Sequence, residues 1–173
     1  EVWGALTPQP ITVVVGACFE GDVAFPYALL IDALRTLFAH WTDAEIGAAL
    51  GAAAGELVKL LPELAQAIPG LAPTPPLEPE AEKRRLFETL ARFLVGLTAA
   101  SPNSPPLLLL LEDLHWSDAT SLDFLHFFAR RLSDFPILIL ATYRRDEVSP
   151  SLVHLLAQLD RERLAEEIML HPL

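Results

Sequence analysis

The amino-acid sequence predicts an α/β fold, a three-layer sandwich in which helices cover a mainly parallel β-sheet. Strand-like apolar runs alternate with amphipathic segments along the chain, and this alternation is typical of parallel sheets. Residues 107–111 are five consecutive leucines that follow two prolines, which indicates a strand buried on both faces at the centre of such a sheet. The chain has 173 residues, of which 52% are hydrophobic, so it is long enough for one domain with a core.

Four segments have the composition of strands. Ile11–Phe19 is rich in β-branched residues, Leu107–Leu111 is the leucine run, and Ile137–Thr142 is a second apolar run that follows a proline. Glu166–Leu170 predicts a last, short strand near the end of the sequence.

Helical periodicity fills the stretches between these strands. An apolar stripe runs over residues 27–41, and Glu80–Thr98 is the clearest amphipathic helix. Thr42 and Glu45 match a capping box that would begin another helix, weakened by glycines and ended by a proline-rich loop at residues 69–79.

Two further helices are predicted from their first residues. Asp118 precedes an amphipathic segment and is a favourable N-cap residue. Ser149 followed by Pro150 indicates a helix that runs to about Arg163. Each helix would connect one strand to the next, as the α/β class requires.

Composition excludes several classes of function for this segment. The net charge of −11 argues against binding nucleic acid or an anionic membrane through its own surface. Cys18 is the single cysteine, so no intramolecular disulfide can form, which fits a reducing, cytoplasmic location. No apolar run reaches the roughly 18 residues of a membrane span, and the first residues do not resemble a signal peptide.

Two acidic residues, Glu112 and Asp113, directly follow the leucine run. Carboxylates at the exit of a buried strand are costly unless they meet a cation or hydrogen-bond donors, and open α/β sheets bind ligands at the carboxyl ends of their strands. In nucleotide hydrolases one such acid holds Mg²⁺, usually through water, and the next polarises the attacking water. The alternative is a pair of acids that caps a loop or a helix N-terminus.

Arg144 and Arg145 follow the next predicted strand. Parallel neighbouring strands would bring this end of the sheet beside the two acids, where an arginine could contact a phosphate. Arg144 is nearer the strand and is the preferred candidate. The alternative is a surface pair with Asp146 or Glu147.

A second interpretation of the acidic stretch is a metal centre. Glu112, Asp113, His115 and Asp118 form an E-D-x-H-x-x-D cluster that could supply metal ligands for a metal-dependent hydrolase. The alternative is that these side chains are structural, with Trp116 packed under the following helix.

Taken together, LLLLLEDLHWSDATSLDFLHFFARRL and ILILATYRRDE resemble the STAND branch of AAA-type P-loop ATPases, as found in LuxR- or MalT-type regulators and in cyclase- or kinase-linked proteins. VVVGACFEGDVAFPYALLIDALR resembles the second strand and following helix of that module, so the resemblance covers nearly the whole chain. It implies an incomplete P-loop NTPase (ASCE) core. The family sheet order is 5-1-4-3-2, and the first three predicted strands would pair in the order 4-3-2. Glu167–Leu170 would be strand 5, displaced or next to strand 4.

The resemblance also assigns the site. Glu112 and Asp113 match the Walker B positions and are expected to bind the metal and to act in catalysis. Arg144 matches the sensor-1 position, which contacts the γ-phosphate, and the implied cofactors are ATP and Mg²⁺. Family members often have Asp at the first Walker B position and Glu at the second, so the exchanged pair found here predicts slow hydrolysis.

The sequence contains no G-x-x-x-x-G-K-[ST] motif. We therefore expect residues 1–173 to be an internal part of an ATPase domain, from strand 2 to strand 5, with the phosphate loop upstream and the lid downstream. EVWGAL would then end the helix after that loop.

The expected function is an ATP-binding and hydrolysing switch module of a multidomain signalling or transcription regulator, which can work as a homo-oligomer. Its partners would be the flanking segments of the parent chain. Residues 1–173 alone would bind ATP weakly and be inactive. The alternative is a non-catalytic interaction module that lost its phosphate loop.

Overall fold

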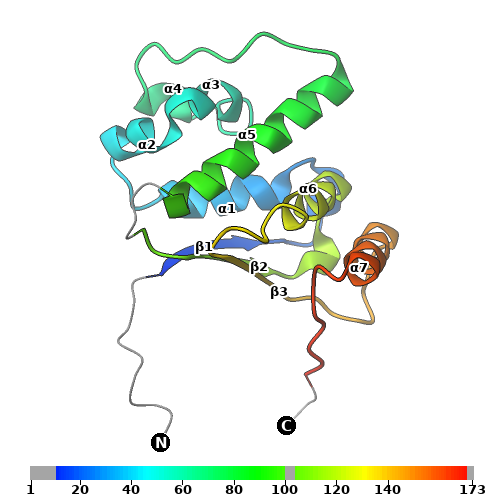
Figure 1. The fold of residues 1–173 in the computed structure, drawn as a ribbon. Coiled ribbons are helices and arrows are strands. Elements are labelled where there is room, and N and C mark those ends of the chain that lie inside the picture. The colour runs from blue at the N-terminus through cyan, green and yellow to red at the C-terminus, as the bar shows by residue number, and fades with distance from the viewer. Residues whose placement is uncertain (1–10, 100–103, 171–173) are drawn as a thin grey trace, which may run out of the picture.

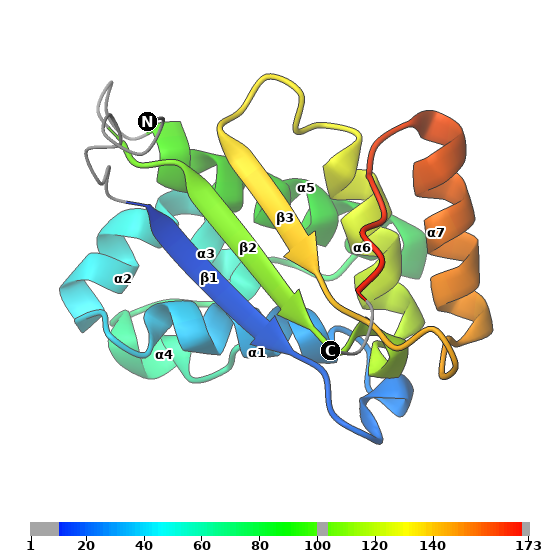
Figure 2. The same ribbon diagram turned by 90° about the horizontal axis from the view of Figure 1, so that it is seen from below.

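The computed structural model describes residues 11–99 and 104–170. Its sheet has three parallel strands in the order β1-β2-β3, with the leucine strand in the middle (Figure 2). Leu107 pairs with Thr12 on one side and with Ile137 on the other. The predicted α/β fold with a parallel sheet is confirmed. The strands are β1 (Thr12–Ala17), β2 (Leu107–Glu112) and β3 (Ile137–Ala141).

Helices cover one face of this sheet, as Figure 1 shows. Between β1 and β2 lie η1 (Asp22–Ala24), α1 (Ala28–Phe38), α2 (Asp43–Leu50), η2 (Gly51–Ala53), α3 (Ala54–Leu57), α4 (Leu64–Ala67) and α5 (Pro79–Ala99). Between β2 and β3 lie η3 (Leu114–Trp116) and α6 (Ala119–Ala129), and α7 (Pro150–Glu162) follows β3. The expectation for EVWGAL lies outside the described residues.

The predicted helix starts are found where the capping residues stand. Thr42 and Glu45 form the complete capping box of α2, and the side chains of Asp118 and Ser149 cap α6 and α7. The helix that begins at Thr42 is broken into the short elements α2 to α4. Gly51, with a positive φ of 46°, ends α2, and Pro62 lies between α3 and α4, where it cannot continue a helix.

All crossover helices lie on the same face of the sheet (Figures 1 and 2). The chain moves from β1 to β2 to β3 in one direction, and right-handed crossovers in one direction place every connecting helix on one side. Two of the three predicted layers are therefore present in the described residues.

The leucine strand is buried on one face rather than on both, which corrects the sequence prediction. Its residues alternate between fully buried positions that face the helices and half-buried Leu108 and Leu110 on the other face. On neighbouring strands Leu138 is 63% exposed and Val13 is 45% exposed. The cause is the one-sided winding of the chain, which the composition of a single strand does not reveal.

The short strand predicted at residues 166–170 is also wrong. Residues 164–170 form no strand, and Ile168 is 74% exposed. A strand forms only when a neighbouring backbone satisfies its hydrogen bonds, and no described strand pairs with this segment. A side-chain contact holds it instead, because the Tyr143 hydroxyl donates a hydrogen bond of 2.6 Å to Glu167 Oε1.

The core lies between the sheet and the helices. Phe124 and Phe128 of α6 and Leu111 of β2 are fully buried there, and the Phe87 and Phe124 rings meet edge to face with centroids 5.4 Å apart. Gly16 allows β1 to approach α1 closely, because a Cβ at this position would lie 2.9 Å from that of Ala33.

A buried ionic cluster fixes the proline-rich loop to the helices above the sheet. Glu56 is only 2% exposed and forms ion pairs with Arg85 at 2.8 Å and Lys59 at 3.2 Å. The Thr74 hydroxyl, from the loop itself, donates to the same carboxylate. A buried carboxylate requires such partners, and the cluster explains how a segment rich in proline keeps a defined path over α3 and α5.

Candidate functional site

The two acidic residues stand at the carboxyl end of the central strand. Glu112 ends β2, and strand alternation places its exposed side chain on the helix-free face with Leu108 and Leu110. Asp113 leaves the strand in a left-handed conformation, with φ 57° and ψ 45°, and its side chain is 46% exposed. Within the described part of the chain, neither carboxylate is paired with a lysine or an arginine.

The ends of β2 and β3 are joined through Thr142. The backbone N–H of Asp113 donates to Thr142 Oγ1 at 3.2 Å, and the N–H of Leu114 donates to its carbonyl oxygen at 2.9 Å. The predicted proximity of the two strand ends is therefore found. The sequence analysis did not single out Thr142. Its role could have been inferred from one feature, a hydroxyl residue directly after a predicted buried strand.

Arg144 follows Thr142 by two residues and is 60% exposed. One of its terminal nitrogens donates to Glu147 Oε1 at 2.8 Å, and this hydrogen bond raises the pKa of the guanidinium above its ordinary value. Its charge also interacts with that of Asp113. The loop of Arg144 thus lies beside Asp113. The Arg144 side chain itself is paired with Glu147, which agrees with the alternative prediction of a surface ion pair.

His115 lies between the acidic loop and the arginine loop. Its side chain is fully buried, and its Nδ1 accepts a hydrogen bond of 3.4 Å from the backbone N–H of Arg144. Its Nε2 lies 3.6 Å from Glu147 Oε2 and has no hydrogen-bond partner. The ring packs against Trp116 with centroids 4.5 Å apart, so Trp116 is a packing residue as predicted.

The metal-centre interpretation is contradicted by the position of Asp118. This carboxylate is 2% exposed, and its Oδ1 accepts hydrogen bonds from the backbone N–H groups of Tyr27 at 3.0 Å and Ser121 at 2.9 Å. Its function is to cap α6 and to hold the start of α1. In residues 11–99 and 104–170, no three side chains of His, Cys, Asp or Glu converge on a common point.

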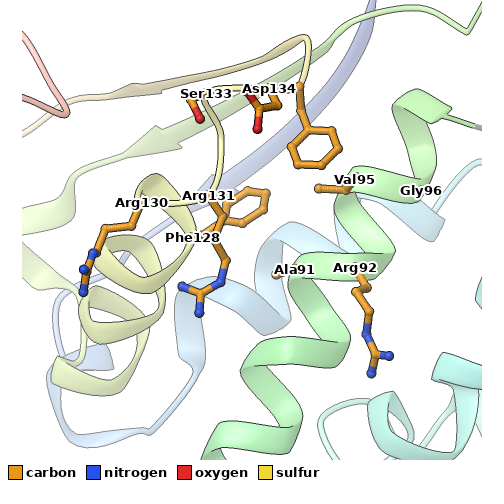
Figure 3. A pocket seen from close by; sticks show the side chains of 10 residues that line it. Ala91, Arg92, Val95, Gly96, Phe128, Arg130, Arg131, Ser133 and Asp134 are labelled. Carbon is orange, nitrogen blue, oxygen red and sulfur yellow. The ribbon is translucent and has the colours of Figure 1, made fainter.

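A hollow of about 520 Å³ lies between α5 and the end of α6 (Figure 3). Arg92 of α5 and Arg131, in the turn after α6, extend at its sides. The Arg131 guanidinium lies 3.6 Å from the centre of the Phe127 ring and donates a hydrogen bond to the Phe127 carbonyl oxygen. Phe135 lines the hollow just before β3 begins, so the hollow is at the amino ends of the strands. It is remote from the acidic residues, which lie at the carboxyl ends.

Cys18 lies directly beneath the acidic edge. It is 1% exposed, and its backbone N–H donates to the Glu112 carbonyl oxygen at 3.0 Å. Burial raises the pKa of the Cys18 thiol from 9.0 to about 12, partly offset by a hydrogen bond with Ser117. The thiol therefore stays neutral and unreactive at neutral pH.

We expect Cys18 to make the free energy of unfolding fall at alkaline pH. Above about pH 9 the unfolded chain releases the thiol proton, while the folded chain keeps it until about pH 12. The stabilising contribution is thus full below pH 9 and is lost towards pH 12, by about 1.4 kcal/mol per pH unit. Urea unfolding at pH 8 to 11 should show the free energy of unfolding of the wild type falling with pH. In Cys18→Ala the slope should lack the contribution of one proton, about 1.4 kcal/mol per pH unit. Equal slopes would contradict the buried neutral thiol.

Comparison with known protein families identifies most of this chain. The family model described as AAA ATPase domain matches residues 2–140, a range that contains β1, β2 and both acidic residues and ends before Arg144. Searches of curated proteins and of solved structures gave no match. In the described ranges, no helix is long and apolar enough to cross a membrane. The fold and the family match agree, and the chain belongs to the AAA ATPase domain family.

Proposed function

We propose that this chain is the acid-bearing part of an ATP-binding switch module, in which Glu112, Asp113 and Arg144 contact the nucleotide. Membership of the AAA ATPase domain family implies nucleotide binding, usually with Mg²⁺. The observation that carries the proposal is a pair of carboxylates at the end of the central strand, next to an arginine loop, that no lysine or arginine of the described residues pairs with. Ligands of open α/β sheets bind at this edge.

The acidic residues fit Mg²⁺. This ion prefers oxygen ligands and keeps several of its waters, and Glu112 and Asp113 offer carboxylate oxygens that are open to solvent. Bound Mg²⁺ would neutralise the charge of the phosphates. Asp113 would accept a proton from the attacking water, as a carboxylate base does.

Arg144 suits the phosphate itself. A guanidinium is planar, always charged, and forms paired hydrogen bonds with phosphate oxygens. In the resting structure its partner is Glu147, so phosphate binding would exchange one anionic partner for another.

The uncovered face supports the proposal that residues 1–173 are one part of a larger ATPase domain. Leu138 and Leu140 of β3 are 63% and 48% exposed, and the outer edge of β3 pairs with no described strand. Open edges and apolar sheet faces are normally covered. We propose that an upstream strand with its phosphate loop, and a downstream lid, complete the sheet and the nucleotide site.

The same proposal extends to the parent protein, a cytoplasmic multidomain signalling or transcription regulator. ATP binding would order the module and hydrolysis would reset it. The net charge of −11 argues against nucleic-acid binding by residues 1–173, so in such a regulator that contact would belong to other domains. The second candidate is a non-catalytic interaction module, which the lack of a G-x-x-x-x-G-K-[ST] motif favours. The reading frame upstream of Glu1 separates the two: a phosphate loop there supports the ATPase, and an immediate start codon supports the interaction module.

Arg144→Gln is the first test of the proposed site, in the chain extended by its upstream and downstream reading frame, here called the extended protein. Losing one charge-assisted hydrogen bond should weaken Mg-ATP binding about 10- to 100-fold in isothermal titration. Arg145→Gln is the matched control, because Arg145 is 68% exposed and faces Glu167 rather than the acids. Unchanged affinity in Arg144→Gln, or equal losses in both variants, would contradict the assignment.

A further inference from the structure

The buried imidazole of His115 has one nitrogen whose hydrogen bonding is not satisfied by its packing. Its Nδ1 accepts the N–H of Arg144, so in the neutral ring the proton resides on Nε2. That N–H is buried and has no hydrogen-bond partner in the described structure. A buried unsatisfied donor costs about 1–3 kcal/mol, and such a group in a native structure calls for an explanation.

The Glu147 carboxylate lies just beyond hydrogen-bond distance of this N–H and already accepts a hydrogen bond from Arg144. Glu147 Oε1 accepts from Arg144 at 2.8 Å, while Glu147 Oε2 stops 3.6 Å short of His115 Nε2. The Arg144 guanidinium and the His115 Nε2–H thus both face the Glu147 carboxylate, and only Arg144 is hydrogen-bonded to it. A shift of Glu147 of less than an ångström would be enough to give His115 a hydrogen bond of about 2.9 Å.

We propose that His115 is a positioning residue that makes Arg144 available for a phosphate oxyanion. When Arg144 turns to the phosphate, Glu147 moves to His115 Nε2 and gains a buried hydrogen bond. The new bond offsets the loss of the ion pair with Arg144, so the arginine leaves at a smaller free-energy cost. This inference rests on the proposed function of Arg144 as the phosphate contact.

The surrounding contacts keep this exchange local. The backbone N–H of Arg144 remains on His115 Nδ1, and Trp116 supports the imidazole from the side. The main chain of the arginine loop can therefore stay in place while the side chains of Arg144 and Glu147 change partners. Asp113 Oδ1 lies 3.9 Å from Nδ1, too far for a hydrogen bond, and the acidic loop is held to the arginine loop through Thr142 instead.

The first experiment needs no nucleotide and uses the 173-residue chain. Side-chain ¹H–¹⁵N spectra of the histidines, with His115 assigned by its loss in His115→Asn, report which nitrogen carries the proton and whether it is hydrogen-bonded. In Arg144→Gln, Glu147 has lost its present partner, so the Nε2 proton of His115 should move downfield. Arg145→Gln should leave it unchanged. An unshifted His115 resonance in Arg144→Gln would overturn the exchange, whatever the protein does with ATP.

The second experiment uses the extended protein and two variants that separate the ring nitrogens. His115→Gln keeps a donor near the Nε2 position, whereas His115→Asn keeps an acceptor near Nδ1 and lacks the donor that faces Glu147. We expect Mg-ATP affinity to fall about tenfold in His115→Asn, the effect of one buried hydrogen bond, and to stay near the wild-type value in His115→Gln.

Glu147→Gln provides the decisive background, because it removes the carboxylate that changes partners. There, His115→Asn should have no further effect on affinity. If His115→Asn lowers Mg-ATP affinity equally in the wild-type and the Glu147→Gln background, the role of His115 is only structural and the proposal is overturned. If Arg144→Gln itself binds Mg-ATP like the wild type, the proposed function of Arg144 fails, and the spectra of the 173-residue chain still decide whether the exchange exists.

Discussion

Asp113→Asn in the extended protein should lower the rate of ATP hydrolysis by about 10²- to 10⁴-fold, the usual contribution of a positioned general base. Asparagine has nearly the same shape but does not accept a proton at neutral pH. It also tolerates the left-handed conformation of this position, where φ is 57°. The fold and the loop should therefore remain intact, so that the loss reports chemistry and not misfolding.

The measurement is steady-state phosphate release, with Mg-ATP affinity determined in parallel. The rate should fall much more than the affinity, because Glu112 still offers its carboxylate to Mg²⁺ while the base that acts on the attacking water is lost. Asp146→Asn is the matched control, since it removes an exposed acid from the neighbouring loop. Hydrolysis at the wild-type rate in Asp113→Asn would exclude Asp113 as the base.

Asp118→Ala should lower the free energy of unfolding by about 2–4 kcal/mol, although Asp118 is only five residues from Asp113. The substitution leaves the buried N–H of Ser121 and the partly buried N–H of Tyr27 without their acceptor, and a buried unsatisfied donor costs about 1–3 kcal/mol. It also removes the N-cap of α6. Urea unfolding of the 173-residue chain measures this effect directly.

Two controls make the Asp118 result specific. Asp118→Asn keeps one acceptor oxygen and should cost clearly less than the alanine variant. Ser149→Ala removes a cap of α7 that accepts a single hydrogen bond, from Leu152, and should cost about 1 kcal/mol. An Asp118→Ala chain as stable as the wild type would contradict the buried cap and would reopen the metal-ligand interpretation.

The sequence predicted the features that depend on local chemistry. β-branched and leucine-rich runs identified three strands, and Thr42, Asp118 and Ser149 identified three helix starts, because a cap acts within one turn of its own helix. The position of Arg144 beside the acids also followed, since parallel strands of similar length end at one edge.

Features that depend on distant partners were not predictable in this way. Five leucines look alike whether helices cover one face or both, so the half-exposed face of β2 required the topology of the whole chain. Residues 166–170 have strand composition but no neighbouring strand. The burial of Glu56 could not be inferred from its own segment, because Arg85 and Thr74 reach it from segments far along the chain.

The sequence names the residues of the candidate site but not the contacts among them. Glu112, Asp113 and Arg144 could be named from their places after strands. The contacts among His115, Glu147 and Arg144 depend on two loops that meet across the sheet edge, and spacing in one loop carries no information about the other. The pairing of Arg144 with Glu147 was one of the two alternatives from the sequence, whereas the approach of His115 to both residues follows only from the structure.

The most direct test of the account is isothermal titration of Mg-ATP into two proteins, the 173-residue chain and the extended protein. If the acidic edge is one half of a nucleotide site, the extended protein should bind with micromolar affinity, typical of a nucleotide site. The 173-residue chain should give little or no binding heat at the same concentrations. Micromolar binding by the 173-residue chain alone, or no binding by the extended protein, would contradict the account.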